Sequence, residues 1–154
     1  MDTVMIAETS IVIAADRERV WKAITQPNTI NKWFNSSARS DAERVFWKFD
    51  RLEAGAPMFF SWKGEDGQEQ GQPGSIALVE PPKRFAFYWT PDPHHDLQSL
   101  VTFALETIPE GTRLTVTEQG FEGLPEAIRQ KRYEMNAEGW RIQPKSIAPY
   151  VMVK

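Results

Sequence analysis

The middle of the chain, between residues 35 and 120, contains no segment of helical periodicity long enough to connect parallel strands. Stretches rich in β-branched and aromatic residues fill it instead, separated by turn-forming runs such as EPPK and PEGT. The predicted strands are residues 43–50, 57–63, 74–80, 84–89, 97–108 and 112–119. Parallel neighbours need crossovers of about a dozen residues or more, so these short connections predict an antiparallel sheet.

Residues 4–14 are partly alternating and β-branched, which predicts one more strand and brings the sheet to seven. Asp16 then offers an N-cap for a helix over RERVWKAIT, which Pro27 stops. The segment NTINKWF predicts a second short helix starting at Asn28, and the polar run NSSARSDAE predicts a loop. The expected fold class is therefore α+β, with two short helices after the first strand.

A long helix is expected from about Leu124, where Pro125 suits the first turn. Its two apolar rows are Ile128, Met135, Gly139 and Ile142, and beside them Tyr133, Trp140, Ile147 and Val151. A helix with so broad an apolar surface must pack against the sheet. Pro144 removes a helical donor, which predicts a bend or an end close to it, with Ile147 and Val151 still docked.

Length and charge limit the classes of protein to consider. A chain of 154 residues matches the usual size of one domain, so we expect residues 1–154 to form a single domain. The net charge is −3 without a run of like charges, which disfavours nucleic acid as a partner. No apolar stretch has the length of a membrane span, so no membrane partner and a cytoplasmic location are expected.

Several short sequences occur together in one order: VWKAIT, INKWF, EPPKRFAFYW, VTFAL, GTRLTVTEQGF and a late EGW. Together they resemble the Hsp90-ATPase-activator-homologue (AHSA1-like) branch of the START-like (SRPBCC) superfamily, over nearly the whole chain. The resemblance implies a helix-grip fold, in which a strongly bent seven-stranded antiparallel sheet wraps the C-terminal helix and leaves an apolar cavity. The proline residues Pro144 and Pro149 depart from the family's apolar helical ladder.

Aromatic rings dominate the sheet face that the alternation turns inward, since the chain has six tryptophans and nine phenylalanines. These rings either pack the core or line a cavity, and the resemblance favours a cavity on this face. The candidate ligand-binding residues are Trp33, Trp47, Phe49, Phe60, Trp62, Phe87, Trp89, Phe103, Glu118, Met135 and Trp140. Rings near the open end of the sheet are the better candidates.

Glu118 continues the inward register of Leu114 and Val116, so its carboxyl group points at an apolar space. It is then the polar anchor of the cavity, with the Trp140 N–H, a water or a ligand donor as partner. In the alternative, the strand ends or bulges there and Glu118 faces water.

Metal and cofactor chemistry has little support in the sequence. Cysteine is absent, and His94 and His95 lie in the loop-like run PDPHHD, where adjacent imidazoles cannot easily face one ion. Neither a phosphate-binding glycine motif nor a nucleophile elbow occurs. We therefore expect no metal and no cofactor.

Three functions remain open. The first is binding of a lipid-like or aromatic hydrophobic small molecule under the C-terminal helix, with no catalytic step required. The second is a polyketide-cyclase-like enzyme in which Glu118 acts as acid or base. The third, suggested by the family resemblance, is regulation of an Hsp90-type chaperone; a protein partner or a homodimer also stays open.

Overall fold

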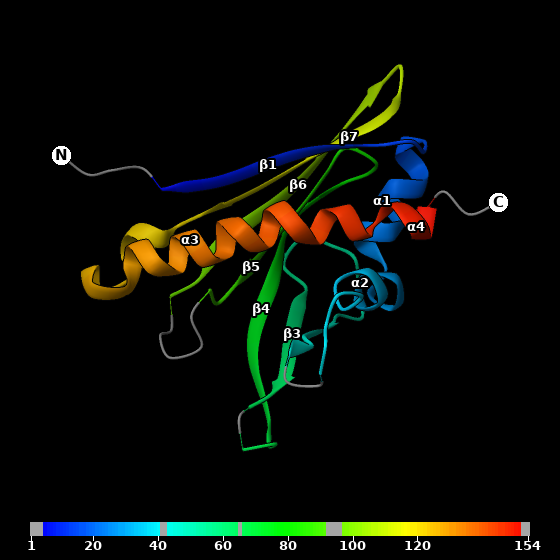
Figure 1. Ribbon diagram of the computed structural model, residues 1–154. Coiled ribbons are helices and arrows are strands. Elements are labelled where there is room, and N and C mark those ends of the chain that lie inside the picture. The colour runs from blue at the N-terminus through cyan, green and yellow to red at the C-terminus, as the bar shows by residue number, and fades with distance from the viewer. Residues whose placement is uncertain (1–4, 41–42, 65, 92–96, 152–154) are drawn as a thin grey trace.

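The computed structural model describes residues 5–40, 43–64, 66–91 and 97–151 (Figure 1). It begins with β1 (Ile6–Ile13), α1 (Arg17–Thr25) and α2 (Pro27–Trp33), and ends with α3 (Glu126–Ile142) and α4 (Ala148–Val151). Between them lie β2 (Phe46–Lys48), β3 (Pro57–Lys63), β4 (Glu69–Glu80), β5 (Arg84–Trp89), β6 (Ser99–Ile108) and β7 (Gly111–Gln119). Short 3-10 helices at Phe121–Gly123 and Gln143–Ser146 flank α3.

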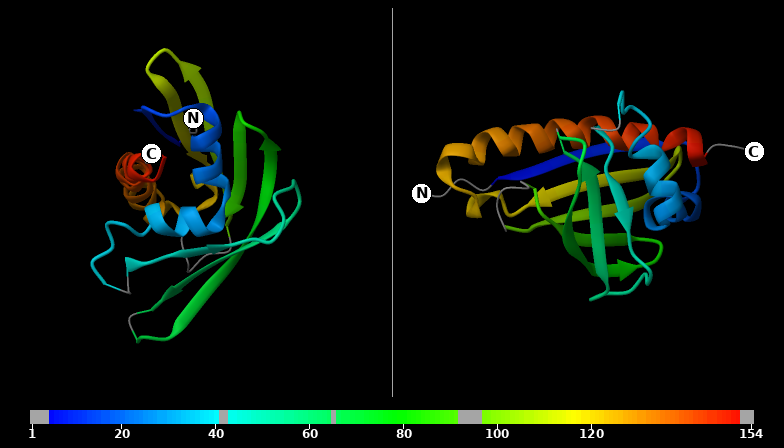
Figure 2. Two further views of the ribbon diagram at one scale, coloured as in Figure 1. Left: turned by 90° about the vertical axis from the view of Figure 1, so that its right-hand side faces the viewer. Right: turned by 90° about the horizontal axis from the view of Figure 1, so that it is seen from below.

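The strands form one seven-stranded sheet in the order β1-β7-β6-β5-β4-β3-β2, and every neighbouring pair is antiparallel. Figure 2 shows the sheet curving around α3, which lies against its concave side, while α1 and α2 cover one end. This arrangement confirms the predicted α+β helix-grip fold. It places the aromatic inner face of the sheet against α3.

The predicted boundaries of several elements were wrong. The strand expected over 74–80 begins five residues earlier, because the polar residues 69–72 pair with the end of β3 in a hairpin arm beyond the core. The strand expected over 43–50 contains only Phe46–Lys48. The second helix begins at Pro27 rather than Asn28, since proline lacks the N–H that is unused at a first helical position.

The proline prediction for the C-terminal helix is confirmed. The α3 helix ends at Ile142, a 3-10 turn contains Pro144, and α4 follows. Ile147 is fully buried and Val151 nearly so. The segment that follows Pro144 therefore still packs against the core. Within the described part of the chain, no helix is both long and apolar enough to cross a membrane.

Two asparagines of the α2 region hold the outer edge of β2. The Asn31 amide donates to the Trp47 carbonyl at 3.0 Å and accepts from the Trp47 N–H at 2.8 Å. Asn35 makes the same pair of bonds with Val45, at 3.0 and 2.9 Å. The two side chains thus replace a neighbouring strand for the sheet edge, and they fix the position of the Trp47 ring.

We predict that Asn31→Ala destabilises the fold by about 1–3 kcal/mol, because the Trp47 N–H and carbonyl lose their partners at a partly buried edge. Urea unfolding followed by tryptophan fluorescence measures the change. Asn28→Ala, on the exposed side of the same helix, is the matched control and should change stability by less than about 0.5 kcal/mol. Equal effects of the two changes would contradict the role given to Asn31.

Candidate functional site

The inner face of the sheet carries a continuous cluster of buried rings. Trp47 lies at its centre, with ring centroids 4.9 Å from Phe87, 5.4 Å from Phe60 and 6.5 Å from Trp33. Phe87 continues the contacts to Phe103 at 5.9 Å. These five rings are at most 3% exposed, and several meet edge to face, the geometry that aromatic pairs favour. Most of the predicted ligand-binding rings therefore pack on one another.

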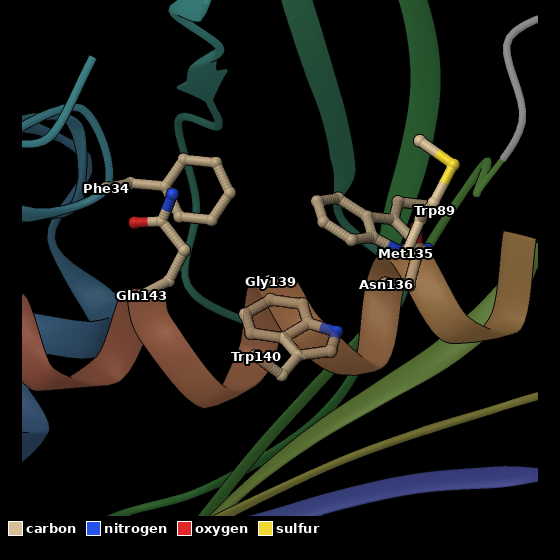
Figure 3. A pocket seen from close by; sticks show the side chains of 7 residues that line it. All are labelled: Phe34, Trp89, Met135, Asn136, Gly139, Trp140 and Gln143. Atoms are coloured by element: carbon tan, nitrogen blue, oxygen red, sulfur yellow. The ribbon is translucent and has the colours of Figure 1, made fainter.

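A pocket of about 140 Å³ opens at the rim of this cluster, between α3, the end of α2 and the end of β5. Its lining residues are Phe34, Trp89, Met135, Asn136, Gly139, Trp140 and Gln143. In Figure 3, Phe34 and Gln143 stand at one end, Trp89 and Met135 stand at the other, and Trp140 lies between them. Three aromatic rings thus form the apolar surface of the pocket.

The spacing of residues on α3 explains its contribution to the pocket. Asn136 and Trp140 are four residues apart, as are Met135, Gly139 and Gln143, so both rows project from one side of the helix. A Cβ atom built at Gly139 would meet no atom within 4 Å. The missing side chain of Gly139 therefore leaves the space between the flanking residues open.

A buried carboxylate lies directly behind the pocket. Glu118 is 0% exposed, and each of its oxygens accepts an indole N–H at 2.8 Å, one from Trp89 and one from Trp140. The Ser99 hydroxyl also donates to it at 2.5 Å, and the Asn136 amide is shared between the two oxygens at 3.2 and 3.3 Å. Three of these donors, Trp89, Asn136 and Trp140, also line the pocket.

The hydrogen bonds define what this carboxylate can do. An indole N–H is a donor only, so an acceptor-only ionised carboxylate suits both indoles at once. The four donors occupy about as many lone-pair positions as a carboxylate has. The inward position predicted for Glu118 is confirmed, as is its contact with Trp140. The group is tied to its neighbours and reaches the pocket only through them.

The predicted site residues fall into two groups around this pocket. Trp89, Met135 and Trp140 line it, and Glu118 is one hydrogen bond away. The predicted residues that do not line it are Trp33, Trp47, Phe49, Phe60, Trp62, Phe87 and Phe103. Of these, Trp62 is half-buried near the end of β3 opposite Gln70, and the other six belong to the buried core. Their part in ligand binding stays a prediction.

Five residues of the site were missed, among them Gly139, which was expected only as part of an apolar row of the helix. Asn136 could have been found, because it lies one helical turn from Trp140, and Ser99 shares the inward parity of Val101 on its strand. Phe34 ends the segment predicted as the second helix, but sequence spacing gave no reason to place it beside α3. Gln143 follows the last residue of α3, and nothing in its local sequence predicts a pocket position.

One polar atom of the pocket region lacks a partner. The Oε1 atom of Gln143 is buried and has no hydrogen-bond partner among the described residues, and the same is true of the Trp47 Nε1 atom. The described residues also contain no group of three or more His, Asp or Glu side chains that could hold a metal ion. His94 and His95 lie outside the described residues.

The sheet curved around a C-terminal helix, with a ring-lined pocket at the rim between them, defines a helix-grip protein of the START-like class. A family model described as Activator of Hsp90 ATPase homolog 1-like protein matches residues 14–151, and the chain belongs to this family. No curated protein sequence matches the chain significantly.

Solved structures share the fold at low sequence identity. A Rhodobacter sphaeroides protein is 23% identical with a TM-score of 0.73, covering 97% of this chain and 93% of its own. A Chromobacterium violaceum protein is 21% identical with a TM-score of 0.72, covering 97% and 99%. DynU16, described as a putative protein in the dynemicin biosynthetic locus, is 21% identical with a TM-score of 0.70, covering 97% of this chain and 48% of its own. These similarities establish the fold.

We predict that Glu118→Gln destabilises the protein by about 1–3 kcal/mol, because glutamine turns an N–H₂ group toward one of the two indole donors. Chemical denaturation at neutral pH provides the measurement. Glu126→Gln removes an exposed carboxylate from the first turn of α3 and should cost less than about 0.5 kcal/mol. A Glu118→Gln protein as stable as the parent would show that the hydrogen bonds of the carboxylate contribute little.

Proposed function

We propose that the protein binds a small hydrophobic molecule at the pocket formed by Phe34, Trp89 and Trp140, without a chemical step. The observation that carries this proposal is the pocket itself: three aromatic rings meet there at the rim of an otherwise packed core. Apolar and aromatic linings with a few polar groups are typical of small-molecule sites. Burial of the ligand's apolar surface supplies the affinity, and Asn136 and Gln143 supply the polar contacts.

The volume of the pocket restricts the part of the ligand that enters it. Pockets for drug-sized ligands measure about 300–1,000 Å³. The pocket here measures about 140 Å³, close to the roughly 150 Å³ of an engineered cavity that holds benzene. A single six-membered ring therefore fits, and a longer ligand would extend past Met135, which is 51% exposed at the edge of the pocket.

A cyclase-like activity is the second candidate, because a buried carboxylate lies next to the pocket. None of the seven residues that line this pocket carries an acidic or basic side chain. The Glu118 oxygens are already engaged by four donors, so a proton transfer would require one donor to leave. These two features favour binding over catalysis.

The proposal predicts that a side chain added at Gly139 blocks binding without removing any existing contact. Gly139→Leu should weaken binding of the neutral probe benzyl alcohol by at least about tenfold, because the leucine fills the space that the glycine leaves open. The indole N–H resonances of Trp89 and Trp140 report binding at this site in an NMR titration.

Gly139→Ala is the matched control. Its single methyl group should leave probe affinity within about twofold, and it should stabilise the helix by about 0.5–1 kcal/mol because alanine replaces glycine in a helix interior. Undiminished binding by a folded Gly139→Leu protein would contradict the proposal, as would the absence of any saturable response in the parent protein.

A further inference from the structure

The chemical groups around the pocket favour a positively charged ligand. Glu118 behind the pocket is buried, and the four side chains that donate to it are neutral. Neutral donors satisfy lone pairs but leave the negative charge uncancelled. A charge in a protein interior is screened less than one in water, so it acts on the adjacent pocket.

The indole groups of Trp89 and Trp140 connect the Glu118 carboxylate to the pocket. Trp89 and Trp140 each donate their N–H to Glu118, and hydrogen bonds to an anion polarise the donor group. Both rings also line the pocket, with centroids 5.4 Å apart, and Phe34 lies 6.5 and 6.3 Å from them. The face of an aromatic ring attracts cations, most strongly for tryptophan.

The side chains that line the pocket place no positive charge beside it. All seven lining residues are neutral, so none of them repels a cation. The Oε1 atom of Gln143 is buried without a partner among the residues that the structure describes, and Figure 3 shows it turned away from Trp89 and Trp140, so it does not face the pocket.

From these features we infer that the pocket selects a protonated amine, with about one six-membered ring of the ligand inside the pocket. This inference rests on the proposed binding function and adds the chemical class of the ligand. The ammonium group lies against the Trp89 and Trp140 rings, with Glu118 as the counter-charge behind them. A carboxylate ligand would meet the same negative charge as repulsion.

The test compares probes of nearly equal size and different charge. Benzylamine, benzyl alcohol and benzoate are titrated into the protein at neutral pH, with the Trp89 and Trp140 indole resonances as the readout. Benzylamine should bind about tenfold more tightly than benzyl alcohol, the gain expected for a desolvated cation on aromatic rings, and benzoate should bind most weakly. Equal affinities for amine and alcohol would overturn the inference while leaving the proposed function intact. No saturable response to any probe would overturn both.

Two variants test the assigned groups. Glu118→Gln should reduce the preference for benzylamine over benzyl alcohol from about tenfold to about twofold, because it removes the counter-charge and keeps both rings. Trp89→Phe keeps an aromatic ring at the pocket and should reduce the preference for benzylamine by about threefold, because the face of tryptophan attracts cations more strongly than that of phenylalanine.

The control variant is Glu126→Gln, which removes one negative charge from the first turn of the same helix and should leave the preference unchanged. If Glu118→Gln does not fold, Trp89→Phe, read out on the Trp140 resonance, still decides the question. An unchanged preference in the folded variants would overturn the inference.

Discussion

The buried carboxylate of Glu118 is the interaction on which the arrangement of this protein depends. It lies on β7 and receives hydrogen bonds from Trp89 at the end of β5, Ser99 on β6, and Asn136 and Trp140 on α3. Burying an ionised group is costly unless it is fully hydrogen-bonded, so these donors must be held in place together. The same set of bonds therefore fixes α3 against three strands of the sheet.

This network also determines what the pocket presents. Because the indole N–H groups of Trp89 and Trp140 point at Glu118, their positions are fixed and their ring surfaces remain for the pocket. The carboxylate that orients the rings is engaged by four donors, which reduces its availability for proton transfer. The proposed ligand binding thus uses residues that also stabilise the fold, so we expect a substitution that alters the network to act on both.

Much of the fold and part of the site follow from strand periodicity. Alternation in GTRLTVTEQ placed Glu118 on the inner face, and the short connections predicted the antiparallel sheet. Periodicity fails where residues have no core to face. The polar residues 69–72 therefore fell outside the strand predicted over 74–80, although they belong to β4. It also fails for contacts between distant segments: Phe34 and Gln143 meet at the pocket because α2 contacts the 3-10 helix Gln143–Ser146 that follows α3.

Gly139 shows how the pocket depends on the size of one side chain. A glycine inside a helix costs about 0.5–1 kcal/mol relative to alanine. A Cβ atom at this position would meet nothing within 4 Å, so neither packing nor the pocket requires glycine rather than alanine. A longer side chain would instead occupy the open space beside Trp140, so the pocket depends on a small residue at position 139.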